Sequence, residues 1–291
     1  MRLRSVEFEM PQAEAAAEFF IQTWGLIDAG KCGATHYMRG TADHGYVIAV
    51  TEAPAKAVVS VSFSGGKDEV ARVRAAAEKN KATLLPMRDY DEPGKPHGFT
   101  MTGQEGQVYR VITETEPVSA LPNDRNHPLQ LTHAVMNVLD RTACEQFAEG
   151  VLGFKLSDRT RAMSFLRCNR QHHAVAYVGA EDRSLNHLAF EMMDMEAVMQ
   201  GIGRMRDHKV PLLWGPGRHG PGNNVFSYFV PPHGGVIEYT SEINQVDDNY
   251  PVGSPEDWKW PPGRIDQWGI SMPNGALGKE AESMYKFRQM Q

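Results

Sequence analysis

Short apolar runs recur along the chain, and several are followed by a segment with helical periodicity. The fullest example opens with residues 185–192, LNHLAFEM, whose apolar and aromatic residues predict a strand. Asp194 is a good N-cap for a helix over 195–209, in which the apolar residues fall on one face. Three further apolar runs predict strands, separated by a Gly/Pro-rich loop and a turn: 210–214, 225–230 and 236–241.

The same order of one strand, one helix and three strands can be followed three more times. The preceding copy opens with a strand over 129–138 and a helix near 141–153, and continues with strands at 154–159, 162–168 and 172–178. Two weaker copies fit the first 115 residues, with opening strands at 3–10 and 57–64 and helices around 13–25 and 68–80. Four βαβββ units indicate a duplicated duplication, because each unit must pair with another to bury its sheet.

A polar, proline-containing stretch predicts the boundary between two pairs of units. Residues 117–128, PVSALPNDRNHP, read as a linker. We therefore expect an N-terminal domain without metal ligands over 1–120, a C-terminal catalytic domain over 130–243, and a tail over 244–291. The tail is irregular and rich in tryptophan, with Trp258, Trp260 and Trp268. Simple packing is the favoured interpretation of these rings, and an apolar lid is the alternative.

Composition narrows the class of protein. The 291 residues are 41% hydrophobic and 23% charged, which is typical of a globular protein and excludes disorder. A net charge of −6 without a basic run argues against a nucleic-acid or anionic-membrane partner. No apolar run approaches the ~20 residues of a membrane span, and the N-terminus lacks a signal-peptide core. Three scattered cysteines without a CxxC pattern complete the expectation of a reduced, cytoplasmic protein.

Candidate chemistry lies in the second pair of units. His133 and His187 occupy matching places in the opening strands of the third and fourth units, and Glu238 lies in the last strand of the fourth. Each residue alone has a simpler interpretation, a hydrogen-bonded core histidine or a solvated glutamate. If the units pack about a pseudo-two-fold axis, however, all three side chains converge. Two imidazoles and one carboxylate form the facial triad of non-haem Fe(II) oxygenases, which leaves three metal positions open.

The first pair of units provides an internal control. Alignment of VVSVSF with LNHLAF puts Ser60 at the place of His187, and alignment of EGQVYRV with GGVIEYT puts Tyr109 opposite Glu238. The first half therefore repeats the scaffold without the ligands, so the His/His/Glu set is not a by-product of duplication.

Four motifs carry a resemblance to a known family: HAVMNV, HHAVAYV, LNHLAFEM and GPGRHGPGNNVFSYFVPPHGGVIEY, which ends at Tyr239. They resemble type I extradiol catechol dioxygenases of the vicinal oxygen chelate (glyoxalase/bleomycin resistance/dioxygenase) superfamily. The resemblance is strong over roughly residues 130–242, whereas the first half shares only the order of strands and helices in each module. It implies an α+β fold of four βαβββ modules paired into two domains, each a partly open mixed β-barrel flanked by helices.

The resemblance also implies roles for individual residues. The metal ligands are His133, His187 and Glu238, which would hold Fe(II), with Mn(II) as an alternative, and O₂ is the co-substrate. The catalytic residues are His173, as the acid–base group, together with His219 and Tyr228, which hydrogen-bond the substrate. The substrate contacts are His172, Trp214 and Asn223, with a supporting or structural role for His172 left open.

Strand alternation separates the two adjacent histidines. Over residues 172–178 it puts His173, Val175 and Tyr177 on one face and His172 on the other, so only one of the pair can face the metal. His173 is the one chosen. Trp214 stands where some relatives that accept carboxylated catechols have arginine, which favours an uncharged aromatic substrate.

The resemblance implies a homo-oligomeric enzyme that opens a catechol ring beside its hydroxyls. Two alternatives remain open. Glyoxalase- and epimerase-type members of the superfamily hold their metal with four protein ligands, and antibiotic-sequestering members bind small molecules without a metal. The strand over 174–178 contains no carboxylate for a fourth ligand, which favours oxygen chemistry.

Overall fold

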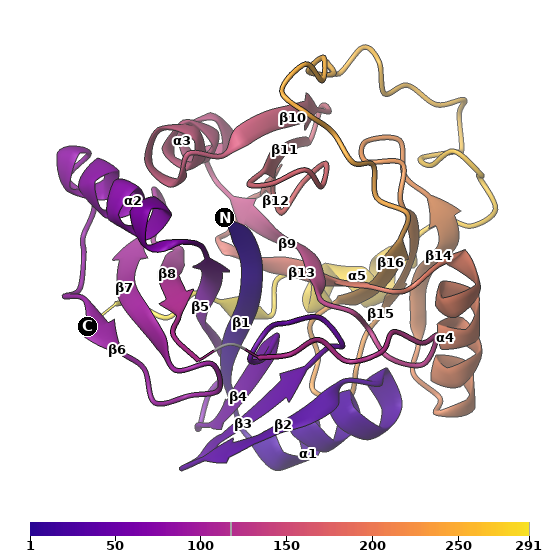
Figure 1. Cartoon of the computed structure of the whole chain (residues 1–291). Helices are drawn as coiled ribbons and strands as arrows, with labels where there is room; N and C mark the ends of the chain where they lie inside the picture. Colours follow the sequence, from indigo (N-terminus) through magenta and orange to yellow (C-terminus); the bar gives the residue numbers. More distant parts are fainter. Residues whose placement is uncertain (117, 291) are drawn as a thin grey trace.

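The computed structural model of the chain contains two curled sheets that lie side by side (Figure 1). It describes residues 1–116 and 118–290, so Pro117, the first residue of the predicted linker, and Gln291, the last of the tail, lie outside the described residues. Each sheet is built from two βαβββ units, and this arrangement confirms the predicted fold class. The limits predicted for the two domains and the tail stay predictions.

The first sheet has eight strands in the order β2-β3-β4-β1-β5-β8-β7-β6. Its elements are β1 (Arg2–Met10), α1 (Ala13–Glu18), the π-helical turn η1 (Phe19–Trp24), β2 (Ile27–Cys32), β3 (Thr35–Arg39), β4 (Ile48–Glu52), β5 (Ala57–Ser64), α2 (Lys67–Lys79), β6 (Arg88–Asp89), β7 (Pro96–Thr102) and β8 (Val108–Glu114).

The second sheet repeats this plan in the order β10-β11-β12-β9-β13-β16-β15-β14, and the short β17 pairs with β13. Its elements are β9 (Leu131–Val138), α3 (Arg141–Phe147), the π-helical turn η2 (Ala148–Leu152), β10 (Lys155–Arg159), β11 (Met163–Arg167), β12 (Val175–Gly179), β13 (Ser184–Glu191), α4 (Met195–Asp207), β14 (Leu212–Arg218), β15 (Val225–Phe229), β16 (Ile237–Ser241), α5 (Gly275–Ala281) and β17 (Tyr285–Lys286).

Element boundaries agree with the sequence pattern except at two places beside the candidate site. The predicted N-cap is confirmed, because the Asp194 carboxylate accepts a hydrogen bond from the Ala197 N–H at 2.8 Å. Strand β14 continues to Arg218, through the first residues of the predicted Gly/Pro loop. Strand β12 begins only at Val175, so His172 and His173 precede the strand and its alternation does not govern them.

Two register shifts at the centre of the second sheet decide which side chains share a face. In the antiparallel pair β9–β13, Leu185 pairs with Met136, whereas His187 pairs with Val135, so Asn186 is an extra residue that forms a bulge. Without this shift His187 would lie on the face opposite His133, because a slip of one residue inverts the side-chain pattern. A second shift after Ala189 restores the original register.

The first sheet contains the same pair of shifts, which identifies the equivalent positions. The shifts between β1 and β5 flank the pairs Ser5–Ser62 and Glu7–Ser60, so Ser5 and Ser60 correspond to His133 and His187. The predicted match of Ser60 is therefore confirmed. The predicted match of Tyr109 with Glu238 is wrong by one residue. Ser62 pairs with Arg110 as Ala189 pairs with Glu238, so Arg110 occupies the equivalent place.

Arg110 compensates the charge of buried carboxylates in the first half. Its guanidinium donates hydrogen bonds to Glu7 at 2.9 Å and to Glu92 at 3.0 Å, and all three side chains are buried. Burial disfavours the charge of Glu7, but Arg110 and nearby hydroxyl donors outweigh this effect and lower the pKa of the carboxyl. A built-in cation therefore stands where the second half has a carboxylate.

The two sheets share one hydrophobic core. At the contact between them, the ring of Trp24 stacks on the ring of Tyr239, with centroids 3.6 Å apart and an angle of 9°. The Tyr239 hydroxyl donates to the Trp24 carbonyl and accepts a hydrogen bond from Arg204 at 2.7 Å. Because Tyr239 directly follows Glu238, the packing between the halves also fixes the end of β16 that carries Glu238.

The tail runs along the second sheet and then returns to the first, where Phe287 bridges to Val58 of β5 (Figure 1). Trp258 and Trp260 pack on Gly220, where an added Cβ would lie 2.7 Å from Trp260 and 2.9 Å from Trp258. These rings therefore support the loop that contains His219. The guanidinium of Arg218 lies over Trp268, 5.3 Å from the ring centroid. The packing interpretation of the tryptophans thus fits the structure.

Two further features bear on the class of protein. Among the described residues, every helix is too short or too polar to span a lipid bilayer. Cys32, Cys144 and Cys168 are free thiols, in agreement with the absence of a predicted disulfide framework.

We predict that Arg110→Met lowers the free energy of unfolding by about 3–5 kcal/mol, because it removes the ion-pair partner of the buried Glu7 and leaves Glu92 with Arg4 alone. Urea unfolding at neutral pH measures the loss. The double variant Glu7→Gln/Arg110→Met should recover part of it, since one uncompensated charge is removed. The matched control is Arg88→Met, at an exposed arginine of β6. Similar small losses for Arg110→Met and Arg88→Met would contradict the prediction.

Candidate metal centre and active-site cavity

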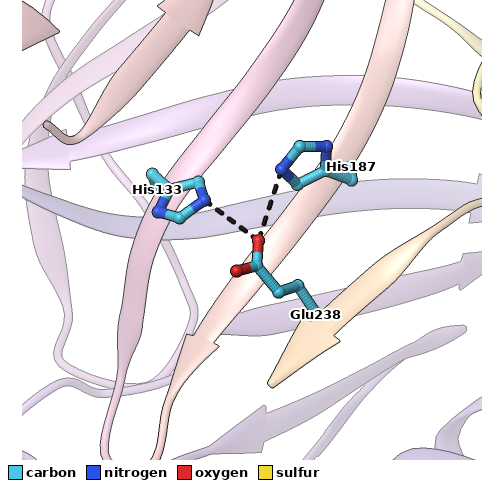
Figure 2. Close-up of side chains that lie close together, drawn as sticks. All are labelled: His133, His187 and Glu238. Carbon is cyan, nitrogen blue, oxygen red and sulfur yellow. Dashed lines mark hydrogen bonds and ion pairs between the residues drawn. The ribbon is translucent and has the colours of Figure 1, made fainter. Parts of the chain in front are cut away.

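Three side chains from the centre of the second sheet converge on one point. His133 projects from β9, His187 from β13 and Glu238 from β16, and all three are buried. Figure 2 shows both imidazoles directed at the carboxylate of Glu238. The Nε2 atoms of His133 and His187 lie 3.1 Å and 3.4 Å from Glu238 Oε2. The ligand atoms lie within 4.8 Å of one another, and the described residues contain no other group that could hold a metal in this way.

Neighbouring residues fix the tautomers of the two histidines. Asn186, the bulge residue, accepts a hydrogen bond from His187 Nδ1 at 2.7 Å. Thr132 lies 3.2 Å from His133 Nδ1, and its hydroxyl donates to the Ala189 carbonyl, so Thr132 accepts from the imidazole. Both rings therefore carry their proton on Nδ1 and turn an Nε2 lone pair toward the carboxylate.

This donor set fits a divalent metal ion. Burial disfavours the charge of Glu238, and neutral rings that turn lone pairs toward it supply no compensating charge. Burial also lowers the pKa of His133, which favours the neutral imidazole. Two imidazole lone pairs and one carboxylate that face the same point require a cation between them. The three residues supply a neutral, neutral and anionic ligand for it.

His173 lies beside this set, with its ring centroid 4.3 Å from that of His133. Burial and the neighbouring histidines hold its pKa well below the usual range, so the ring is neutral. The companions that strand alternation predicts for His173 are wrong, because Val175 and Tyr177 belong to the main core, whereas Ala176 and Val178 pack beside the cavity. The residues before β12 follow a turn, and this turn directs His173 to the cavity.

A chain of three buried side chains fixes the orientation of His173. His172 Nε2 lies 2.8 Å from Asp158 Oδ2, and its Nδ1 lies 3.0 Å from His173 Nδ1. Because the Asp158 carboxylate accepts from Nε2–H, the Nδ1 atom of His172 carries a lone pair and accepts from His173 Nδ1–H. The Nε2 atom of His173 is then left as a proton acceptor.

His219 and Tyr228 form a second polar pair at the cavity. The Tyr228 hydroxyl lies 2.7 Å from His219 Nε2. Burial lowers the pKa of His219 to about 4 and raises the pKa of Tyr228 well above its usual range, so both groups are neutral near pH 7. The ring of His219 stacks on Phe226 with centroids 4.0 Å apart, which fixes its plane.

A cavity of about 240 Å³ joins these groups. It is lined by His133, His187, His173, His219 and Tyr228 and otherwise mainly by apolar side chains, among them Val135, Met163, Phe165, Val178, Leu213 and Trp214. Pro273 and Glu282 of the tail complete the wall, together with Pro221 and Asn186. The volume is below the ~300–1,000 Å³ of pockets for drug-sized ligands, and the lining suits a small aromatic molecule.

Two of the three expected substrate contacts lie outside this cavity wall. Trp214 lines the cavity, and its Nε1 donates to the Ser271 carbonyl at 3.2 Å. His172 does not, because both of its ring nitrogens are engaged by Asp158 and His173. Asn223 does not either, since its side-chain oxygen accepts from Gln267 at 2.8 Å. The open supporting role for His172 is therefore the one that its contacts favour.

Sequence reasoning missed four residues that shape the site: Thr132, Asp158, Asn186 and Glu282. Thr132 and Asn186 each directly precede a candidate ligand histidine, and only their hydrogen bonds distinguish them from other polar strand residues. Asp158 lies on β10 and reaches His172 through the fold. Glu282 comes from the tail, far from any motif, and no local signal identifies it.

Comparisons with known proteins agree with this architecture. A model of the Glyoxalase/Bleomycin resistance protein/Dioxygenase superfamily matches residues 130–239. The chain is 27% identical to metapyrocatechase 2 of Cupriavidus necator, over 89% of this chain and 86% of that protein. It is 26% identical to the 2,2',3-trihydroxybiphenyl dioxygenase of Sphingomonas paucimobilis, over 73% of this chain and 70% of that protein.

A solved structure matches almost the whole chain. The Mn(II)-bound glyoxalase from Novosphingobium aromaticivorans superposes with a TM-score of 0.87 at 29% identity, over 95% of this chain and 93% of that one. The fold is therefore that of the superfamily in both halves. Together these matches confirm what the sequence motifs indicated: residues 130–239 of this chain form a domain of the Glyoxalase/Bleomycin resistance protein/Dioxygenase superfamily.

Proposed function

We propose that the chain is an extradiol dioxygenase that uses Fe(II), or alternatively Mn(II), and O₂ to open the ring of a catechol-type aromatic substrate. One observation carries the proposal. A three-ligand His/His/Glu set borders a small, largely apolar cavity that also presents His173, His219 and Tyr228. The two curated relatives, by their names a metapyrocatechase and a trihydroxybiphenyl dioxygenase, support the same reaction class.

His133, His187 and Glu238 would hold the metal. A divalent iron in this set supplies Lewis acidity and a path for electrons between the catechol ring and dioxygen. The three protein ligands all lie on one face, and the cavity lies beside them, so substrate and dioxygen can approach from the same side. Apolar walls from Phe165, Leu213 and Trp214 exclude water from that side.

The protein's own groups handle the protons. A catechol must lose a hydroxyl proton to bind through both oxygens, and the Nε2 atom of neutral His173 is the acceptor. The same atom can later return the proton to an oxygen that leaves when the O–O bond breaks. His219 and Tyr228 can donate a hydrogen bond to a substrate oxygen that gains negative charge during ring opening.

Glyoxalase activity is the alternative that a specific observation favours, since the superposed Mn(II) protein is a glyoxalase by its title. The number of ligands argues against this alternative. Glyoxalase-type members hold their metal with four protein ligands, and only three candidate ligands are grouped among the described residues. A cytoplasmic location and a homo-oligomeric state complete the proposal, as expected from the sequence.

Anaerobic reconstitution with Fe(II), followed by a catechol panel in air, tests the function. We expect oxygen uptake with a yellow ring-fission product that contains both atoms of ¹⁸O₂. Metal binding with thiohemiacetal turnover but no oxygen uptake would establish the glyoxalase alternative. Failure to bind metal would point to a metal-free binding protein.

The ligand and acid–base roles predict different losses. His187→Ala should abolish iron retention, because it removes one of the three ligands. His173→Phe should retain iron and lose turnover by about a hundredfold or more, the usual contribution of acid–base catalysis. Metal content by mass spectrometry, measured beside kcat, separates the two effects. Equal iron loss in both variants would contradict the assigned roles.

Asp158 should act on turnover through the tautomer of His172. We expect Asp158→Asn to lower kcat by about a hundredfold with little change in KM or iron content. The matched control is Tyr250→Phe, because the Tyr250 hydroxyl donates to the same carboxylate at 3.3 Å, while its ring, which packs edge-on against His172, is kept in the variant. A similar loss of kcat in both variants would assign Asp158 a purely structural role.

A further inference from the structure

Glu282 gives the cavity a charge that the metal centre does not explain. It follows α5 in the tail and lines the cavity wall, where it is a charged residue among mainly apolar ones. Among the lining residues within the described chain it is the only carboxylate, and no lysine or arginine lines the wall. A catechol that enters the cavity therefore meets one negative side chain besides the imidazoles and the phenol.

The backbone of Glu282 is anchored to the metal-binding strands. Its carbonyl accepts a hydrogen bond from Asn137 Nδ2 at 2.8 Å, and its N–H donates to the Gly278 carbonyl at 2.8 Å. Asn137 in turn accepts from Asn186 at 3.0 Å, and Asn186 accepts from the ligand His187. A continuous set of hydrogen bonds thus places this residue of the tail relative to the ligand histidine.

The carboxylate of Glu282 has no hydrogen-bond or ion-pair partner within residues 1–116 and 118–290. The side chain is partly buried, and its Oε1 atom lies close to Gly278, where an added Cβ would be 3.2 Å away. Its oxygens are not among the fully buried polar atoms, so water can reach them, and a substituent that displaces this water without bringing a donor leaves the carboxylate unsatisfied at a cost. A ligand that brings a hydrogen-bond donor to this wall would relieve the cost, whereas an anionic ligand would increase it.

We propose that Glu282 determines substrate choice: it favours catechols whose substituent carries a hydrogen-bond donor, a hydroxyl or amino group, and rejects catechols whose substituent is a carboxylate. This inference rests on the proposed function and names the substrate class of that site. The residue acts on the substituent and not on the reacting ring, so its effect is on discrimination between substrates.

A series of catechols of nearly equal size tests the inference. The holoenzyme is assayed with catechols that carry an ethyl, 2-hydroxyethyl, 2-aminoethyl or carboxymethyl group at ring position 3 or 4. We expect kcat/KM to be highest for the hydroxyethyl and aminoethyl compounds and lowest for the carboxymethyl compound. Glu282→Gln should reduce the penalty on the carboxymethyl compound by about fivefold, as for one partly exposed charge contact, and Glu282→Arg should reverse the order.

The matched control is Glu280→Gln, which removes a charge from the same segment at an exposed position outside the cavity wall. It should leave every ratio unchanged. A wild-type preference for the carboxymethyl compound, or equal ratios in wild type and Glu282→Gln, would overturn the role of Glu282 while ring cleavage stands. Absence of oxygen uptake with every compound would instead overturn the proposed function, and the inference with it.

Discussion

A buried carboxylate that faces two imidazole lone pairs is the interaction on which the second half depends. Glu238 is fully buried, and the Nε2 atoms of His133 and His187 face its carboxylate at 3.1 Å and 3.4 Å. Asn186 and Thr132 hold the Nδ1 protons of those rings, so their Nε2 atoms cannot also present protons while the rings are neutral. A cation at the centre would compensate this buried charge, and this need, more than any single contact, makes the three side chains a candidate metal site.

Duplication explains how such a site arises on an otherwise ordinary sheet. Both halves contain the two register shifts that put residues of the central strands on one face. The first half fills the place of Glu238 with Arg110, which pairs with Glu7 and so carries its own cation. The second half has the carboxylate and the histidines, with no built-in cation between them. The same scaffold therefore supports a closed ion pair in one copy and a candidate coordination site in the other.

The sequence predicts the order of elements and the ligand set because both depend on local patterns. Strand β5 and helix α4 follow directly from apolar periodicity, and His133 and His187 stand at matching places in repeated motifs. Positions that depend on register are less accessible. The bulge at Asn186 has no sequence signal, and alignment by motif alone chose Tyr109 where strand pairing gives Arg110. The alternation argument takes His172 and His173 as strand residues, although β12 begins only at Val175. It therefore places His173 on the wrong face of the strand, with Val175 and Tyr177.

Residues that join distant segments explain what the sequence could not predict. Asp158 accepts hydrogen bonds from His172, Tyr250 and Gly253, so one carboxylate connects the His172–His173 pair to the start of the tail. Glu282 reaches the cavity from the far end of the same tail. The candidate ligands and His173 lie on or directly beside the central strands, where packing fixes them, while part of the cavity wall comes from the tail, outside residues 130–239. The tail is nevertheless tied to the central strands, because β17 pairs with β13 and the Glu282 carbonyl accepts a hydrogen bond from Asn137 of β9. The part of the wall that the tail supplies is therefore held at a fixed place relative to the candidate metal ligands.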